Sequence, residues 1–449
     1  MLKLFALVIA VFVLPLFAEA QLLQPSRGED DIALARQFVE SLAKEDFANA
    51  TKGFDAAMQG AMPEAKLQQT WKSLLGQVGA FKKQVNTRTE KFRQYNVVFV
   101  ACEFEKTPLD VKVVFNTKKE IAGLFFVPSQ TPSAHTFAPP SYAKTNMYHE
   151  KEIVVGSGEF SLPGTLTLPI GSGLFPAVVL VHGSGPNDRD ETVGPNKPFR
   201  DIALGLASRG IAVLRYEKRT KVYGAKLVAR KDSITVNEET IDDALAAVLS
   251  LSRTENINPQ KIFVLGHSLG GTVIPRIGVR NPNIAGFICL AGATRPFEDL
   301  IVDQMTYIFS LDNTISNEEK TELEQIKAKV ARVKDKKLSL STFSTELPLG
   351  VNAKYWLDLR DYNPAETATK LTQPMLFLQG GRDYQVTIAD FDGWKRTLSS
   401  KTNVEFKLYP NLNHLFIEGE RKSTPEEYQI AGHVAEPVID DVAKWVKKW

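Results

Sequence analysis

The chain has 449 residues, of which 43% are hydrophobic and 24% are charged, a composition typical of a globular protein with a sizeable core. This length favours two domains over one. The formal net charge is only +2, with 54 basic residues against 52 acidic ones, so electrostatics gives no reason to expect a nucleic-acid partner.

Residues 1–20 are predicted to be a signal peptide. Lys3 is the only charge before an apolar run that ends at Phe17, and the small residues Ala18 and Ala20 follow at the positions that a signal peptidase reads. The run is shorter than the roughly 20 residues that a membrane span needs. A retained membrane anchor is the alternative interpretation. We therefore expect an exported protein, periplasmic or secreted, with no stable membrane anchor.

The chain contains two cysteines, Cys102 and Cys289, which lie far apart in the sequence. Each lies within an apolar, strand-like run. A disulfide framework would use more cysteines than this. Two buried free thiols are therefore expected.

Residues 21–127 are predicted to form a small α+β domain in which helices precede strands. Apolar residues recur at helical spacing between residues 31 and 75, and three short strands are then expected. These strands are Val97–Phe104, Val111–Phe115 and Ile121–Val127. No catalytic group is evident in this part of the chain. Residues 128–147 begin with PSQTPSAHTFAPP, whose prolines and small polar residues predict a linker.

Residues 148–449 show a different rhythm, in which apolar runs alternate with helical patterns. Glu152–Val155 and Thr165–Leu168 are predicted to pair as edge strands. Buried strands are expected at Ala177–Val181, Ile211–Arg215, Ile262–Leu265, Ile284–Leu290, Met375–Leu378 and Val404–Leu408. Helices are expected near Phe199–Ser208 and Thr240–Leu251, after Leu269, and near Val434–Trp449. This alternation predicts an α/β fold with a mostly parallel sheet and helices on both faces. The alternation stops between about 294 and 362, where a helical cap insertion is expected.

One short motif indicates the chemistry. Residues 266–270, GHSLG, match G-x-S-x-G, and the match lies between a predicted buried strand and a predicted helix. In hydrolases with this motif, the serine occupies a sharp turn that leaves its hydroxyl exposed. The flanking glycines allow the turn to close. The motif therefore predicts Ser268 as a nucleophile.

A serine hydroxyl needs a base to accept its proton. His414 lies in the loop after the last predicted strand, where an α/β-hydrolase carries its base. The other histidines are His135 and His149 in or beside the linker, His182 in VHGSG, His267 next to the serine, and His433 at the start of the terminal helix. We therefore predict His414 as the base.

The base needs an orienting carboxylate. Asp383, in the segment GGRD, follows the predicted strand Met375–Leu378. The resulting chain order of serine, aspartate and histidine is that of α/β-hydrolases. Asp390 and Asp392 are competing candidates, and both lie farther into the following helix.

An oxyanion hole is the remaining requirement, because negative charge develops on the carbonyl oxygen when the serine adds. The predicted strand Ala177–Val181 ends in the glycine-rich segment HGSG. The backbone N–H groups of Ser184 and Leu269 are the predicted donors. A plain glycine turn is the alternative interpretation of this segment.

From about Tyr148 to Trp449, the segments VHGSGP, GHSLGG and GGRD and the His414 loop resemble the α/β-hydrolase superfamily. The longer run HGSGPNDRDETVGPNKPFRDIALGLASRGIAVLRYEKR resembles exported bacterial serine hydrolases of the serine aminopeptidase and prolyl oligopeptidase branch, many of them esterases. The N-terminal segments EDFANATKGFDAAM and GAFKK are similar to a small uncharacterised domain that precedes such hydrolases. The resemblance implies the triad and oxyanion positions named above, and it implies no particular substrate.

These patterns predict a serine hydrolase that cleaves a small-molecule carboxylic ester through an acyl-enzyme. No cofactor is expected, and no cysteine–histidine cluster suggests a metal. A peptidase acting on short peptides is the nearest rival, with Glu298, Asp299 or Asp303 holding the substrate amine. A non-catalytic binding protein on a hydrolase fold is the second rival. The cap aromatics either line an acyl pocket or pack the core of the cap: Tyr307, Phe309, Phe343, Tyr355 and Trp356.

Overall fold

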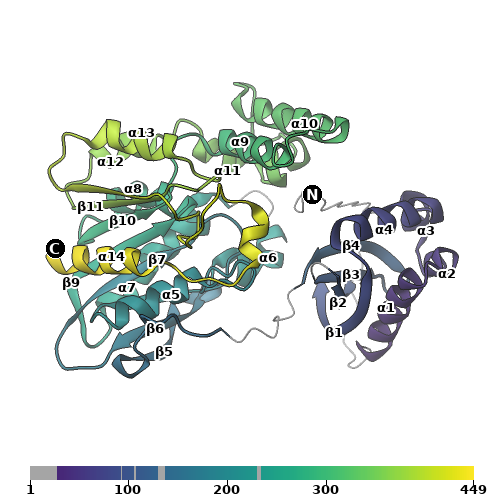
Figure 1. Ribbon diagram of the computed structural model, residues 1–449, viewed down its shortest axis with the longest axis horizontal. Helices are drawn as coiled ribbons and strands as arrows, with labels where there is room; N and C mark the ends of the chain where they lie inside the picture. The colour runs from purple at the N-terminus through teal and green to yellow at the C-terminus, as the bar shows by residue number, and fades with distance from the viewer. Residues whose placement is uncertain (1–27, 93, 106–107, 130–136, 230–233) are drawn as a thin grey trace. The chain divides into compact units, whose positions relative to one another are not determined.

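The computed structural model describes residues 28–92, 94–105, 108–129, 137–229 and 234–449. The chain divides into two compact units, Met1–Thr136 and Phe137–Trp449 (Figure 1). The predicted signal peptide lies outside the described residues. Within the described part, no helix combines the length and the apolar character needed to cross a membrane.

The first unit is an antiparallel sheet packed with helices. Its helices are α1 Gly28–Ala43, α2 Phe47–Thr51, α3 Ala56–Ala61 and α4 Glu64–Val78. Its strands, in spatial order, are β1 Phe81–Phe92, β2 Tyr95–Phe104, β3 Leu109–Phe115 and β4 Ile121–Pro128. Trp71 of α4 lies at the centre of an aromatic cluster, with ring centroids 5.9 Å from Phe104 and Phe126 and 6.4 Å from Phe81. The predicted α+β class of this unit is confirmed.

Strand β1 is absent from the sequence-based predictions. Its residues FKKQVNTRTEKF contain few apolar side chains, and Val85 is 52% exposed. The strand lies at the edge of the sheet and, among the strands that the structure describes, pairs only with β2. Because neither face of β1 carries an apolar stripe, its sequence lacks the alternation by which strands are recognised. Charged side chains also protect such an edge from pairing with another chain.

The second unit is built on an eight-stranded sheet with the order β12-β11-β10-β9-β7-β8-β6-β5. Its strands are β5 Tyr148–Val155, β6 Leu162–Pro169, β7 Phe175–Val181, β8 Ala212–Tyr216, β9 Ile257–His267, β10 Gly286–Leu290, β11 Met375–Gly380 and β12 Val404–Tyr409. The predicted pairing of the edge strands is confirmed, with Glu152 opposite Thr165 in the antiparallel β5–β6 pair. Strand β6 also pairs antiparallel with β8, and the remaining pairs are parallel.

Helices cover both faces of this sheet, as the alternating pattern predicts. On one face α5 Pro198–Ala207 and α14 Glu436–Lys448 pack side by side over Val178 and Leu180 of β7 (Figure 1). The opposite face holds α7 Asp242–Ser252, α8 Leu269–Arg280, α12 Pro364–Thr369 and α13 Ile388–Leu398. Val179 and Val181, which alternate with Val178 and Leu180 along β7, point into the core beneath these four helices. Each central strand is therefore apolar on both sides.

The insertion between β10 and β11 is helical, as predicted. It contains α9 Phe297–Phe309, α10 Asn317–Lys334 and α11 Ala353–Leu359. A capping box at Ser316 and Glu319 begins α10. Trp356 is fully buried in a small separate core and stacks on Phe297 with ring centroids 5.8 Å apart. The insertion therefore has packing of its own. One further helix, α6 Arg219–Ala229, follows β8.

Both cysteines are buried free thiols, which confirms the expectation from the sequence. Cys102 lies in the first unit and Cys289 in the second, so they belong to separate cores. Burial raises the pKa of each thiol to about 12, which keeps both protonated at neutral pH.

Candidate active site

Ser268 occupies the sharp turn between β9 and α8. Its backbone has φ 55° and ψ −118°, a conformation that a residue other than glycine adopts only under constraint. Two backbone hydrogen bonds hold the turn. The Ser268 N–H donates to the Leu290 carbonyl at 2.9 Å, and the Thr272 N–H donates to the Ser268 carbonyl at 2.9 Å. The serine side chain remains partly exposed, as a nucleophile at such a turn requires.

Two glycines make this turn possible. A methyl group on Gly266 would lie 2.4 Å from the carbonyl carbon of Gly270, and one on Gly270 would lie 2.2 Å from the carbonyl oxygen of Val181. Neither contact could relax by a side-chain movement, because both partners are backbone atoms. The ends of β7 and β9 and the start of α8 therefore approach one another as closely as backbones can.

His414 and Asp383 form a buried pair in the loops after β12 and β11. Nδ1 of His414 lies 2.6 Å from Oδ2 of Asp383, and the two side chains are 5% and 0% exposed. The other carboxylate oxygen, Oδ1, accepts the backbone N–H groups of Gln385 and Val386 at 2.7 and 3.0 Å. With the carboxylate at Nδ1, the neutral ring carries its proton there, and Nε2 keeps its lone pair for another group.

The His414 loop is anchored beside the serine turn through His267. Nε2 of His267 lies 2.9 Å from the carbonyl oxygen of His414, and the two rings are 4.6 Å apart. His267 directly precedes Ser268 in the chain. This contact therefore brings the segments that carry Ser268 and His414 to the same end of the sheet.

The competing aspartates have other surroundings. Asp390 is fully buried, accepts the backbone N–H groups of Thr294 and Arg295, and pairs with the Arg295 guanidinium at 2.8 Å. Asp392 lies farther along α13. His414 is thus joined to Asp383, whereas Asp390 is fully engaged in holding the start of the insertion.

The remaining histidines are not placed to act as the base. Burial lowers the pKa of His182 to about 4, and the neutral ring donates from Nε2 to the Asp188 carbonyl at 3.0 Å. His433 precedes α14 rather than beginning it, and its Nδ1 lies 3.0 Å from a carboxylate oxygen of Asp201. His149 is exposed on β5, and His135 lies outside the described residues.

The predicted oxyanion donors flank the serine. Ser184 lies just beyond β7, and a methyl group on Gly183 would lie 3.1 Å from the Cβ of Ser268, so this loop passes close to the nucleophile. Leu269 is the first residue of α8, where backbone N–H groups have no partner inside the helix and the helix dipole favours negative charge. Among the hydrogen bonds of the described residues, none uses the Ser184 N–H. Neither N–H group is thus engaged by another group within the described part of the chain.

A buried charged network behind this loop is absent from the sequence-based predictions. Glu191 accepts the Gly183 N–H at 2.6 Å and lies 2.9 Å from Nδ1 of His267. Burial opposes the charged form of both side chains, but their mutual attraction prevails, so the pKa of Glu191 is lowered and that of His267 is raised. A second pair, Lys218 and Glu239, lies behind the same loop with a separation of 3.1 Å. Glu191 lies in the charged run DRDET, two residues after the glycine-rich segment HGSG, but the run does not indicate its partners.

The cap aromatics divide between packing and exposure. Three of them are buried: Phe309, Tyr355 and Trp356. Phe343 is 73% exposed. Tyr307 of α9 stacks on Tyr384 with ring centroids 4.9 Å apart, and Tyr384 is the neighbour of Asp383. Tyr307 is therefore the cap aromatic that lies beside the candidate site, while packing accounts for the three buried rings.

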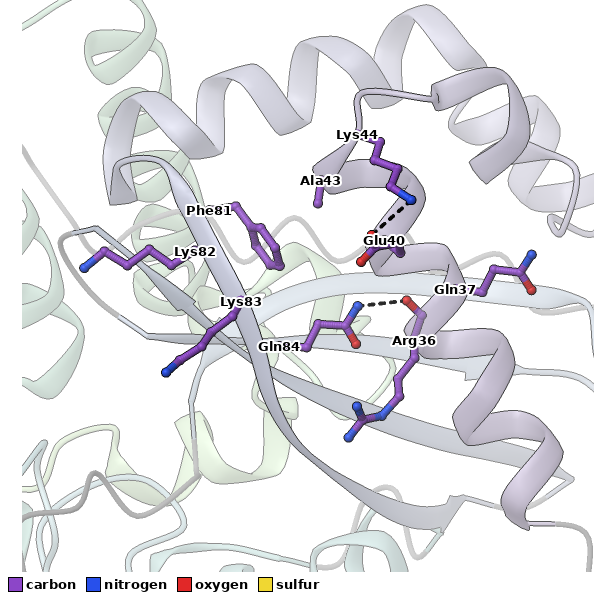
Figure 2. Close-up of a pocket in the computed structure, with 9 residues that line it drawn as sticks. All are labelled: Arg36, Gln37, Glu40, Ala43, Lys44, Phe81, Lys82, Lys83 and Gln84. Atoms are coloured by element: carbon purple, nitrogen blue, oxygen red, sulfur yellow. Dashed lines mark hydrogen bonds and ion pairs between the residues drawn. The ribbon is translucent and has the colours of Figure 1, made fainter.

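A hollow of about 700 Å³ lies in the first unit, between α1 and the start of β1 (Figure 2). Its wall includes Arg36, Glu40, Lys44, Phe81 and Gln84. Figure 2 shows Lys44 paired with Glu40 and the Gln84 amide bonded to the Arg36 carbonyl, at 3.1 and 3.0 Å. The described residues that line it include no nucleophile with a base, and all candidate catalytic residues lie in the second unit.

Two solved structures resemble part of the chain. Est1E from Butyrivibrio proteoclasticus is 14% identical and aligns over 66% of this chain and 99% of its own, with a TM-score of 0.43. An esterase from Pyrococcus furiosus is 16% identical and aligns over 67% of this chain and 92% of its own, with a TM-score of 0.42.

Sequence similarity to a known relative covers more of the chain than the similarity to these structures does. Residues 35–124 match a family model described as a protein of unknown function (DUF3887), and residues 177–422 match one described as serine aminopeptidase, S33. Esterase EstD of Thermotoga maritima is 39% identical over 413 residues, which make up 92% of this chain and 94% of that relative. The S33 model spans more than half of the chain, and the relative matches nearly all of it. The chain therefore belongs to the serine aminopeptidase (S33) family of α/β-hydrolases, and the protein is a hydrolase.

Proposed function

We propose that the protein cleaves carboxylic esters through an acyl-enzyme, with Ser268 as nucleophile, His414 as base and Asp383 as its orienting carboxylate. The observation that carries the proposal is the 2.6 Å contact between His414 and Asp383, in loops anchored beside a serine in a strained strand-to-helix turn. The name of the relative, an esterase, is a second support. The N–H groups of Ser184 and Leu269 complete the proposed site as the oxyanion hole.

The reaction proceeds in two halves. Nε2 of His414 takes the Ser268 hydroxyl proton as Oγ adds to the ester carbonyl carbon, and the two N–H groups stabilise the resulting oxyanion. The tetrahedral intermediate then breaks its bond to the alcohol oxygen, which receives the proton from His414, and the acyl group stays on Ser268. Water, deprotonated by His414, then adds to the acyl carbon. The bond from that carbon to Oγ breaks as His414 returns the proton to Ser268, and the acid is released. Asp383 stabilises the imidazolium in both halves.

A peptidase with the same triad is the nearest rival, and the acidic residues of the cap argue against it. An aminopeptidase needs a free carboxylate for the substrate amine. Asp299 is paired with Lys334, and Asp303 is paired with Arg295. Burial raises the pKa of Glu298, which disfavours its charged form. Ester hydrolysis is therefore the function that the geometry supports best.

A non-catalytic binding role is the second rival. A non-glycine residue held at positive φ costs of order 1–3 kcal/mol, and such strain persists where the surroundings enforce it. Ser268 has this conformation between two glycines that permit no side chain. A binding role does not require this turn, whereas a nucleophile between a strand and a helix does.

A comparison of substrates tests the proposal. We expect short-chain p-nitrophenyl esters to be hydrolysed with a kcat/KM at least about 100-fold above that for aminoacyl p-nitroanilides, a difference of about 2.7 kcal/mol in transition-state stabilisation. The Glu298→Gln variant serves as the matched control, because an ester hydrolase should keep the same ratio without this carboxylate. If wild-type protein hydrolyses the anilides faster than the esters, and the Glu298→Gln variant loses this anilide hydrolysis, the protein is instead an aminopeptidase.

We also propose that residues 1–20 are a cleaved signal peptide and that the mature protein acts outside the cytoplasm. The short apolar run that ends before Ala18 and Ala20 supports this. N-terminal sequencing of protein recovered from the cell envelope or the medium should begin near Gln21. An intact Met1 on protein extracted only with membranes would contradict the proposal.

A further inference from the structure

The carbonyl group of Gly183 receives hydrogen bonds from two side chains. Nζ of Lys218 donates to this oxygen at 2.7 Å, and Nδ2 of Asn187 donates to it at 3.2 Å. Lys218 lies two residues beyond the end of β8 and is only 1% exposed. A buried lysine is thus aimed at the backbone of the loop that follows β7.

This carbonyl belongs to the same peptide unit as the N–H of Ser184. A peptide unit is planar and, as at every described position here, trans, so the carbonyl and the N–H point in opposite directions. Whatever fixes the Gly183 oxygen therefore also fixes the direction of the Ser184 N–H. A cation on the carbonyl oxygen also draws electron density toward it, and hydrogen bonds linked in this way polarise one another.

We propose that Lys218 is a positioning residue of the oxyanion hole, which aims the Ser184 N–H at the developing oxyanion and strengthens it as a donor. The inference rests on the proposed ester hydrolysis and deepens it. Lys218 itself does not touch the substrate. It acts through the Gly183–Ser184 peptide, and Glu191 holds the preceding peptide through the Gly183 N–H at 2.6 Å.

The surroundings of Lys218 support a role beyond packing. A buried charge is costly unless it is paired and hydrogen-bonded. The partner here is Glu239, in the short π-helical turn Asn237–Ile241, at 3.1 Å. Glu239 in turn accepts the hydroxyl of Tyr355 at 2.8 Å, from helix α11 of the insertion. The segments that carry Lys218, Glu239 and Tyr355 thus combine to hold the Lys218 ammonium group against the Gly183 carbonyl. They do so although the neutral amide of Asn187 already reaches the same oxygen.

The test compares Lys218→Met with wild-type protein on a p-nitrophenyl ester. Methionine keeps much of the length of the side chain and removes the ammonium group. We expect kcat to fall by about 10- to 100-fold, less than or comparable to the loss of a direct oxyanion donor, with KM nearly unchanged. The affinity for a trifluoromethyl ketone should fall by a similar factor, because its adduct with Ser268 carries the oxyanion. A merely structural role would not shift this affinity and kcat together while sparing KM.

Matched variants separate this effect from general damage. Lys218→Met combined with Glu239→Gln avoids an unpaired buried carboxylate and should show the same loss of kcat. Arg219→Met removes the neighbouring cation, which pairs with Asp243 at 3.1 Å, and should leave kcat and inhibitor affinity unchanged. Asn187→Ala removes the second donor to the Gly183 carbonyl and should lower kcat by a smaller factor than Lys218→Met. Because Asn187 is partly exposed, this measurement remains possible even if the Lys218 variants do not fold.

Three results would overturn the inference. One is wild-type kcat in the folded double variant, another is a loss confined to KM, and the third is an equal loss of kcat in Arg219→Met. The proposed function fails separately, and this inference with it, if wild-type protein neither hydrolyses the ester nor binds the ketone.

Discussion

Replacing Ser268 with alanine is expected to abolish ester hydrolysis and to prevent covalent labelling by a fluorophosphonate probe. The substitution removes the oxygen that attacks the carbonyl carbon, and it leaves the backbone conformation equally accessible, because alanine and serine share the same Cβ. Loss of the nucleophile in a serine hydrolase lowers kcat by roughly 10⁶. The residual rate would come from the oxyanion donors and from substrate positioning alone. Steady-state rates and labelling on a gel, measured in the same buffer, check both expectations.

Ser252→Ala is a suitable control for this experiment. Ser252 is exposed at the end of α7, and its hydroxyl donates to the Leu249 carbonyl at 2.9 Å. This variant should keep both the rate and the labelling. Wild-type turnover in a folded Ser268→Ala protein would rule out the proposed nucleophile, and labelling retained without turnover would point to a second reactive serine.

The central sheet could be predicted from the sequence because its strands are buried on both faces. In β7, Val178 and Leu180 enter one core, whereas Val179 and Val181 enter the other. A strand of this kind gives a continuous apolar run that is easily found between helical patterns. The order of the strands in space does not follow from such runs, since β9 pairs with β7 rather than with β8.

Two of the elements that escaped prediction lack a continuous apolar signal. Strand β1 lies at an edge, where both faces are largely polar. Helix α6 contains Gly224, a residue of low helix propensity, and its backbone departs from helical geometry at Tyr223, where φ is −117°. In both cases the structure is set by contacts with neighbouring elements rather than by local pattern.

The candidate site likewise contains residues that the sequence predicts and residues that it does not. Ser268 stands in a local motif, and the chain order of the three residues suggested Asp383 and His414. Glu191 and Lys218 have no such motif, because each meets its partner only in the folded chain. Glu191 reaches His267 across 76 positions, and Lys218 reaches Gly183 across 35. Groups that support a loop from behind are thus visible in the structure and hidden in the sequence.

Asp383→Asn should lower kcat by about 10⁴, if the pair behaves as in other serine hydrolases. Oδ1 of Asp383 accepts two backbone N–H groups, from Gln385 and Val386, and the asparagine oxygen can keep both bonds. The amide NH₂ then faces Nδ1 of His414 as a donor. Nδ1 must accept this bond, so the ring proton moves to Nε2, which can no longer take the proton of Ser268. Because the backbone contacts persist, stability to urea should change little while activity collapses.

His414→Ala removes the base itself and should lower kcat by several orders of magnitude. Combined with Ser268→Ala it should cost scarcely more than either change alone, because the residues act as one unit. His433→Ala is the matched control, since this histidine is partly exposed and contacts Asp201. His267 is unsuitable as a control, because it contacts the His414 carbonyl and, through Glu191, is linked to the Gly183 peptide. An equal loss in folded His433→Ala and His414→Ala, or full additivity with Ser268→Ala, would mean that His414 does not activate this serine.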